Sequence, residues 1–303
     1  MTQTEAATKL TLAQALAQFI HQLDKNPLTV QAYRADVLQF ISYLAETDYT
    51  VTTPGQVERY HITEYLRHLK GSGRSGVTRA RKLISLQVFF ASLVQSGVLP
   101  HSPAVNIERP KKEKRPKDFL RPDEYNKLLV QAAGEVRDYA MLQVFLQTAI
   151  RVSELVAIKL ADLDMDDRTL AVHGKGEKER TIPLEKKAMQ ALKSWLTVRP
   201  QVPDQHLFVT YHQTGFSIRG VRKLVDKYLK LAAITKKISC HGLRRTCLTN
   251  KAARNMNAFA LQRLAGHQDM ETTRIYVQLG TEDLRPMMEA TGRTPLNGEV
   301  VGN

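Results

Sequence analysis

The sequence predicts a mainly α-helical protein with a small β-sheet, an α+β fold, divided into two domains. Apolar residues recur at helical spacing in most segments, one pair of short alternating segments flanks a glycine-rich turn, and a charged, proline-containing run interrupts the chain. A chain of 303 residues is also longer than one small core requires. We expect an N-terminal tail over 1–9, a helical domain over 10–107, a linker over 108–117, a second domain over 118–290 and a C-terminal tail over 291–303.

The first domain is expected to hold four helices, over 11–22, from Pro27 onward, over 62–69 and over 78–95. Asn26 before Pro27 marks a helix start, because asparagine caps a helix and proline fits its first turn. The glycine-rich run 70–76 separates the last two helices.

The run 108–117 reads as a linker. It contains two prolines and six basic residues against two acidic ones, a composition that cannot form a packed element. It is either a solvated tether or a strap along a phosphate backbone, and charge alone leaves both open.

The second domain is expected to be mostly helical. Strand-like segments at 170–173 and 181–184 flank a Gly-Lys-Gly turn and predict a β-hairpin. Helices are expected over 122–133, 138–148, 151–155, 188–198, 219–232 and 243–254.

Composition narrows the functional classes. The net charge of +14 and pI near 9.8 favour a polyanion partner, although membrane affinity or solubility alone would also fit. The N-terminus lacks a secretory signal and no segment approaches the ~20 apolar residues of a membrane span, so we expect a cytoplasmic protein without membrane contact. Cys240 and Cys247 lack paired C-x-x-C spacing, so we expect no metal and no disulfide.

Six residues form a candidate catalytic set that suits metal-free attack on a phosphodiester. A tyrosine phenol can form a covalent phosphate ester. Arginines can hold the non-bridging oxygens, and imidazole or lysine can transfer protons. No cofactor is needed for this chemistry. The set is Arg151, Lys175, His241, Arg244, His267 and Tyr276.

The surrounding motifs resemble those of the tyrosine recombinase (phage integrase) family, most of all its short Xer-type members. They stand in the family's order and at its spacing, and the resemblance runs from about residue 10 to 288. The motifs are 148–155 (TAIRVSEL), 174–180 (GKGEKER), 241–244 (HGLR), 265–267 (AGH) and 272–276 (TTRIY).

The resemblance implies a helical core-binding (SAM-like) DNA-binding domain and a catalytic domain that close around duplex DNA as a C-shaped clamp. Within the catalytic set, it makes Tyr276 the nucleophile and Lys175 the acid that protonates the leaving 5′ oxygen. His241 would accept the tyrosyl proton, the two arginines would clamp the phosphate, and His267 would hydrogen-bond to it. Lys178 competes for the role of Lys175.

DNA contacts are also expected outside the catalytic set. One helix of the first domain resembles the family's DNA-contacting helices, and the linker would follow the phosphate backbone. The residues concerned are Thr78, Arg79 and Lys82 in the helix, and Lys111, Lys112, Lys114 and Arg115 in the linker.

We therefore expect a site-specific recombinase that forms a 3′-phosphotyrosyl intermediate and exchanges strands between two duplexes through a Holliday junction. Double-stranded DNA and other copies of the chain, as a tetramer on paired sites, or a related recombinase, would be its partners. Two alternatives share some of these features: a type IB topoisomerase-like relaxing enzyme, and a non-catalytic DNA-binding accessory protein.

Overall fold

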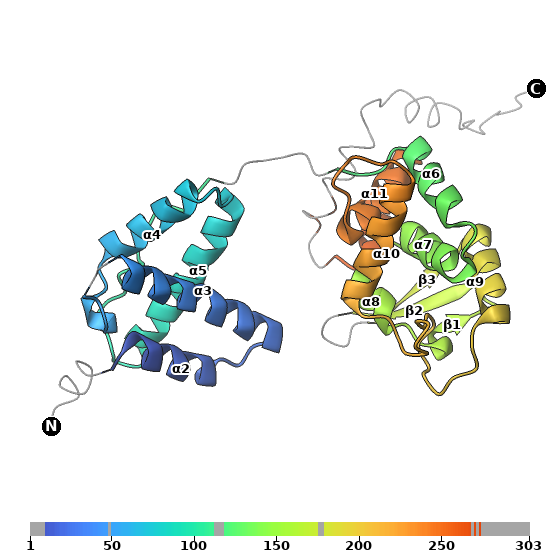
Figure 1. Ribbon diagram of the computed structural model, residues 1–303. Helices are drawn as coiled ribbons and strands as arrows, with labels where there is room; N and C mark the ends of the chain where they lie inside the picture. The colour runs from blue at the N-terminus through green and yellow to red at the C-terminus, as the bar shows by residue number, and fades with distance from the viewer. Residues whose placement is uncertain are drawn as a thin grey trace, which may run out of the picture. The chain divides into compact units, whose positions relative to one another are not determined.

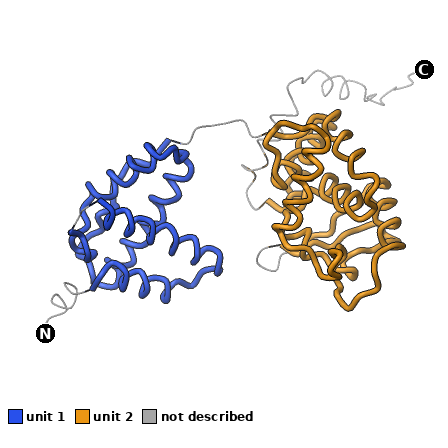
Figure 2. Tube along the Cα trace, in the orientation of Figure 1, with its two compact units in different colours: residues 1–115 blue, residues 116–303 orange. Residues whose placement is uncertain are grey.

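The computed structural model describes residues 10–47, 50–111, 118–174, 179–267, 270 and 273 (Figure 1). The chain divides into two compact units, residues 1–115 and 116–303 (Figure 2). This division falls inside the run expected to be a linker. Both units are mostly helical, and one three-stranded sheet lies in the second, so the predicted α+β class is confirmed. No helix in the described part of the chain is long and apolar enough to cross a membrane.

The four expected helices of unit 1 are present, with a short 3-10 turn in addition. Side-chain caps mark the starts of the first two: Thr11 Oγ1 accepts from Gln14 N at 3.2 Å, and Asn26 Oδ1 accepts from Leu28 N at 3.0 Å. The elements are α2 (Leu12–Gln22), α3 (Pro27–Glu46), η1 (Pro54–Gln56), α4 (Arg59–Gly71) and α5 (Gly76–Gln95).

Aromatic side chains join these helices into one core. Phe40 of α3 meets Tyr65 of α4 with ring centroids 5.3 Å apart, and Phe19 of α2 meets Phe89 of α5 at 5.4 Å. Both contacts are edge-to-face, the geometry that aromatic quadrupoles favour. The apolar faces predicted from helical spacing therefore point inward together.

Unit 2 contains the expected helices and hairpin, with most helices starting one to three residues earlier than the pattern suggested. A 3-10 turn, a third strand and a helix near residue 260 were not predicted. Its elements are α6 (Pro122–Ala132), α7 (Val136–Thr148), α8 (Val152–Ala157), η2 (Leu160–Asp162), β1 (Leu163–Asp164), β2 (Thr169–His173), β3 (Glu179–Pro183), α9 (Lys186–Val198), α10 (Ile218–Leu231), α11 (Cys240–Ala253) and α12 (Ala258–Ala265).

Helix α7 forms the centre of unit 2. It is buried along nearly its whole length and packs against α6, α9 and α11 (Figure 1). The antiparallel sheet, in the order β1-β2-β3, pairs Leu170 with Ile182 and Val172 with Arg180. Leu170, Val172 and Ile182 face the same core, so the hairpin is held to the unit from its buried side.

Candidate active site

Arg151 lies at the junction of α7 and α8. Helix α7 ends at Thr148, the next residue has the left-handed φ of 52°, and Arg151 becomes the N-cap of α8. Its backbone N and its Nη1 donate to the two carboxylate oxygens of Glu154, both at 2.7 Å. The Arg151 side chain is still 44% exposed, so the carboxylate orients the guanidinium without covering it.

Arg244 is buried in the first turns of α11. Its Nη1 donates to the carbonyl oxygen of Ala149 at 2.6 Å, and its Nη2 donates to that of Ala265 at 2.7 Å. These carbonyls belong to the ends of α7 and α12, where helix carbonyls lack partners within the helix. Arg244 therefore fixes two helix ends against α11, and the same bonds fix the plane of its own guanidinium.

His267 follows the end of α12. Gly266 adopts a left-handed φ of 61° that ends the helix, and His267 Nδ1 then hydrogen-bonds with Thr273 Oγ1 at 3.0 Å. Burial lowers the pKa of His267 to about 4, assisted by the positive charges of Arg244 and Arg151. Above that pH the imidazole is neutral, which suits it to donate one hydrogen bond to a phosphate but not to act as a cation.

The predicted phosphate-binding residues converge in one place. Arg151 Nη2 donates to the carbonyl oxygen of Gly266 at 3.2 Å, directly before His267. The charges of Arg244, Arg151, His241 and Arg180 all act on the pKa of His267, as expected of groups gathered around one point. His241 and Arg244 both lie on α11, which begins three residues earlier than the helix expected over 243–254, and His241 is exposed.

Part of this cluster opens into a groove of about 1590 Å³ between the hairpin, the start of α8 and α12. Arg151 and His267 line it, together with Arg180 and Arg263. Within the described ranges, no cluster of His, Cys, Asp and Glu could hold a metal ion. Cys247, on α11 with Arg244, is buried, and burial raises the pKa of its thiol to about 12. The groove therefore offers arginine charge to an anion.

Two predicted catalytic residues, Lys175 and Tyr276, lie outside the described residues. The competing Lys178 does so as well. His173 ends β2 and Glu179 begins β3, on either side of Lys175 in the sequence. These two residues pair with each other across the hairpin.

Lys82, which the family resemblance led us to expect at the DNA surface, is buried. Its side chain is 9% exposed, and Nζ donates to Asp36 Oδ1 of α3 at 2.8 Å. Arg81 and the Ser85 hydroxyl donate to the same carboxylate. Lys82 thus helps to neutralise a buried aspartate between α3 and α5, and contact with DNA would require it to leave this ion pair.

The other predicted DNA-contacting residues have different surroundings. Thr78 and Arg79 are half-buried in the first turn of α5, where Arg79 Nε donates to the carbonyl oxygen of Arg74 at 3.3 Å. Lys111 is exposed. The remaining linker residues, Lys112, Lys114 and Arg115, lie outside the described part of the chain.

Arg180 belongs to the site but was not singled out from the sequence. It bonds to both carboxylate oxygens of Glu154 and lines the groove beside Arg151. A signal was present, because strand alternation places Arg180 on the same inward face as Ile182. A lone arginine in a charged run gives no reason to choose it without knowing that a buried carboxylate lies opposite.

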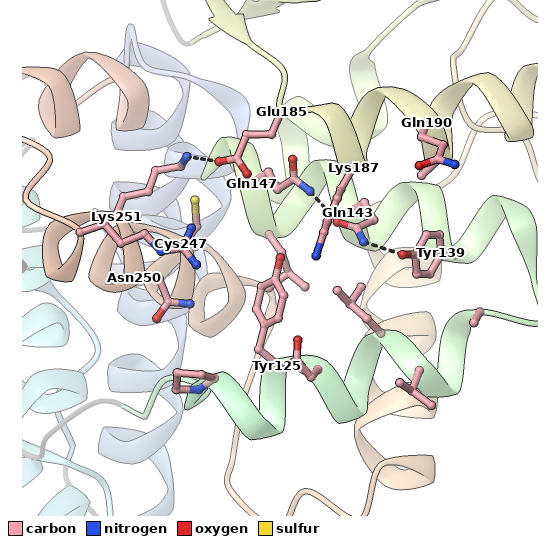
Figure 3. Close-up of a pocket in the computed structure, with 18 of the residues that line it drawn as sticks. Tyr125, Tyr139, Gln143, Gln147, Glu185, Lys187, Gln190, Cys247, Asn250 and Lys251 are labelled. Carbon is pink, nitrogen blue, oxygen red and sulfur yellow. Dashed lines mark hydrogen bonds and ion pairs between the residues drawn. The ribbon is translucent and has the colours of Figure 1, made fainter.

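A second groove, of about 960 Å³, lies on unit 2 between α6, α7, α9 and α11 (Figure 3). Its wall carries a chain of hydrogen bonds: Gln147 Nε2 donates to Gln143 Oε1 at 2.5 Å, and Gln143 Nε2 donates to the Tyr139 hydroxyl at 2.8 Å. Gln147 Oε1 is buried and has no hydrogen-bond partner among the residues that the structure describes. A charged pair, Lys251 with Glu185 at 2.7 Å, lies at the edge.

Comparison with known proteins accounts for both units. The phage integrase family model matches residues 118–282, and the phage integrase N-terminal SAM-like domain model matches residues 16–97. The chain belongs to the tyrosine recombinase (phage integrase) family. It is therefore a site-specific recombinase that breaks and rejoins DNA by the tyrosine recombinase mechanism. The predicted family and activity are confirmed.

Individual relatives agree with this family. A tyrosine recombinase XerD of Listeria innocua is 33% identical over 261 residues, which cover 83% of this chain and 88% of the relative. A tyrosine recombinase XerC of Thermodesulfovibrio yellowstonii is 32% identical over 285 residues, which cover 89% and 91%. These recombinases favour the recombinase reading over the topoisomerase-like and non-catalytic alternatives.

Solved structures show the same fold. The Tn1549 transposon integrase in complex with transposon right end DNA has a TM-score of 0.77 at 22% identity, covering 93% of this chain and 99% of that one. A lambda integrase tetramer bound to a Holliday junction has a TM-score of 0.74 at 15% identity, covering 90% and 79%.

Proposed function

We propose that the groove at Arg151 binds the scissile phosphate of duplex DNA. The convergence of Arg151, Arg244 and His267 carries this proposal, because two guanidinium groups and a neutral imidazole match the oxygens of one phosphodiester. Arg151 and Arg244 would hold the non-bridging oxygens. His267, neutral above a pKa of about 4, would donate a hydrogen bond.

Proton transfer in the proposed reaction involves three further residues. Tyr276 would attack the phosphorus and form a 3′-phosphotyrosyl bond. A tyrosine phenol has an unperturbed pKa of about 10, so it needs a base, and His241, exposed beside Arg244, would accept its proton. Lys175 would protonate the 5′ oxygen as it leaves. The same steps in reverse, with a 5′ hydroxyl of the partner duplex as nucleophile, would rejoin the strands.

The nucleophile can be tested with a nicked substrate that traps the covalent adduct. Tyr276→Phe removes only the hydroxyl, so DNA binding should persist while adducts on denaturing gels disappear. A second tyrosine, Tyr211→Phe, is a matched control, because that ring is 78% exposed and contacts Arg137 rather than the groove. Adducts formed by Tyr276→Phe would refute the assignment.

Unit 1 and the linker would add DNA contacts to those of the catalytic site, as expected of a clamp on duplex DNA. Thr78, Arg79 and exposed Lys111 would contribute phosphate contacts, with the basic residues of the rest of the linker. The excess of 44 Lys and Arg over 30 Asp and Glu supports this, since phosphate neutralisation dominates DNA affinity. Since its substrate is DNA, we place the enzyme in the cytoplasm.

The active form would be an assembly of four copies, or of copies with a related recombinase, on paired sites. The groove between α6, α7, α9 and α11 would receive residues 281–290 of a neighbouring copy (Figure 3). Leu284, Met287 and Met288 of that segment would meet apolar side chains that line the groove, such as Leu129 and Leu146. The acidic residues of the segment would meet Lys187 and Arg254. Such a head-to-tail contact closes when every copy both gives and receives.

Two substitutions and one truncation test this assembly. Val130 lines the groove and is 68% exposed, whereas Val198, at the end of α9, is 59% exposed and lies outside it. Val130→Glu should abolish paired-site complexes on native gels and leave single-site binding intact, while Val198→Glu should change neither. Truncation after Gly280 should behave as Val130→Glu does. Normal synapsis and recombination by the truncated chain would exclude the exchange.

A further inference from the structure

Arg180 connects the hairpin to the rest of the active site. It stands at the beginning of β3, directly opposite Val172 of β2, and its side chain is only 16% exposed. An arginine buried to this extent in a β-hairpin needs hydrogen-bond acceptors nearby, because an unpaired buried charge costs free energy. The contacts of its guanidinium therefore show what the hairpin is attached to.

Three hydrogen bonds leave the Arg180 guanidinium. Nη2 donates to Glu154 Oε2 at 2.9 Å, and Nη1 donates to Oε1 of the same carboxylate at 3.2 Å. Nε donates to the carbonyl oxygen of Leu264, in the last turn of α12, at 3.2 Å. A single side chain thus ties β3 to α8 and to α12, and only a planar forked cation can reach all three acceptors at once.

The turn before His267 fits around this guanidinium. A Cβ on Gly266 would lie 3.1 Å from Arg180 Cζ and 3.1 Å from Nη1, tighter than side chains normally pack. The backbone at Gly266 therefore packs directly against the Arg180 guanidinium and leaves no room for a side chain between them. The hairpin, the carboxylate that orients Arg151 and the turn of His267 are therefore in contact at one residue.

We propose that Arg180 is a positioning residue that anchors the β2–β3 hairpin and thereby sets the place of the proton donor carried in its turn. The proposal rests on the proposed role of Lys175, which follows β2 by two residues. The described ends of β2 and β3 fix where the turn begins and ends. A general acid must lie within hydrogen-bond reach of the leaving oxygen, so a small shift of the hairpin is a large loss of rate.

The geometry indicates that loss of Arg180 would shift the hairpin and would leave Arg151 in place. Without Arg180, the carboxylate of Glu154 keeps its two 2.7 Å bonds from the backbone and side chain of Arg151. Arg151 also keeps its bond to the carbonyl of Gly266. The hairpin, in contrast, loses all three of the bonds that Arg180 makes to α8 and α12.

The test compares cleavage of normal DNA with cleavage of a strand that carries a bridging 5′ sulfur, which leaves without a proton. Arg180→Gln should bind DNA as the unmodified enzyme does and cleave the normal strand about 100-fold more slowly. The sulfur strand should restore its rate to within about tenfold. Arg168→Gln removes an exposed charge from the far end of the same hairpin and should leave both rates unchanged.

Two further variants separate the possible failures. Lys175→Ala should be rescued by sulfur, and Arg151→Ala should not. If Lys175→Ala is not rescued, the general-acid role is wrong. If Lys175→Ala is rescued but Arg180→Gln is equally slow on both strands, Arg180 acts on the phosphate or on folding, and the hairpin proposal is overturned.

Amide hydrogen exchange tests the anchor without reference to Lys175. In Arg180→Gln, the amides of β2 and β3 should exchange about tenfold faster, while those of α7 keep their rates. Unchanged exchange in the hairpin would overturn the proposal whatever the cleavage data show. Equal acceleration in α7 would mean that the variant destabilises the whole unit, which would overturn it as well.

Discussion

Replacing Glu154 by glutamine should destabilise unit 2 in a pH-dependent way. The carboxylate is 4% exposed and accepts four hydrogen bonds: from Arg151 N, Arg151 Nη1, and both Nη atoms of Arg180. Burial alone would raise the pKa of Glu154, but the hydrogen bonds from Arg180 and the Arg151 amide outweigh it and hold the pKa below its usual range. The native state therefore favours the charged carboxylate.

The size of the effect follows from the bonds that an amide cannot accept. An amide nitrogen in place of Oε2 would face two donors, Arg151 N and Arg180 Nη2, and lose both bonds. Each charge-assisted bond contributes about 1.5 kcal/mol, so Glu154→Gln should cost about 3 kcal/mol at pH 7. The bonds counted end on a backbone amide and a mostly buried guanidinium, so solvent screening reduces the figure little.

The sign of the pH dependence is fixed by the lowered pKa. A depressed carboxyl pKa stabilises the native state above the unfolded pKa of about 4.3, and this stability is lost as pH falls through the folded pKa. The difference in unfolding free energy between the unmodified protein and the Glu154→Gln variant should therefore be full at pH 7 and smaller at about pH 3.5.

The assay is urea unfolding followed by tryptophan fluorescence. The single tryptophan, Trp195, is buried in unit 2, so its emission reports that unit alone. Glu179→Gln is the matched control, because that side chain is 57% exposed and its ion pair with His173 spans 3.9 Å. The control should lose less than about 0.5 kcal/mol. A Glu154→Gln cost as small as the control's, or equal at both pH values, would refute the reasoning.

Three further predictions follow from the same site. Cleavage should proceed unchanged in excess EDTA, because arginine charges bind the phosphate; loss of cleavage that magnesium restores would contradict this. His267→Gln, which keeps a neutral donor, should retain most activity and the same pH–rate profile between pH 6 and pH 8, whereas His267→Ala should cleave about 100-fold more slowly; a changed profile for the glutamine variant would show that His267 titrates. Gly266→Ala should lower the free energy of unfolding by about 1 to 2 kcal/mol, because the residue has a φ of 61°; calorimetry that finds no change would exclude strain at this turn.

Much of the fold could be predicted from local patterns. Helices with side-chain caps, such as the one that begins after Asn26, appear where their apolar spacing and caps predicted them. The hairpin was predictable from two alternating segments around a glycine-rich turn. Strand β1 was missed because two residues carry no alternation, and α12 was missed although Asn257 caps it, because its eight residues give a short periodic signal.

Within the site, the sequence by itself determined the chemical inventory. Residue types and their order identified Arg151, Arg244, His241 and His267, and the structure brings these four together. Local sequence also sets the backbone where some of these residues lie, at helix ends and turns. Arg151 at the N-cap of α8 and His267 after the left-handed Gly266 are examples.

Only the tertiary structure decided which basic side chains stay exposed to a ligand and which form buried ion pairs within the protein. Lys82 was expected to contact DNA and Arg180 was not singled out, yet the first neutralises buried Asp36 and the second bridges Glu154 and α12. Their partners lie 46 and 26 residues away in the sequence. Helical or strand periodicity assigns a residue to a face of its own element, but a buried ion pair depends on what packs against that face, and only the folded chain supplies that.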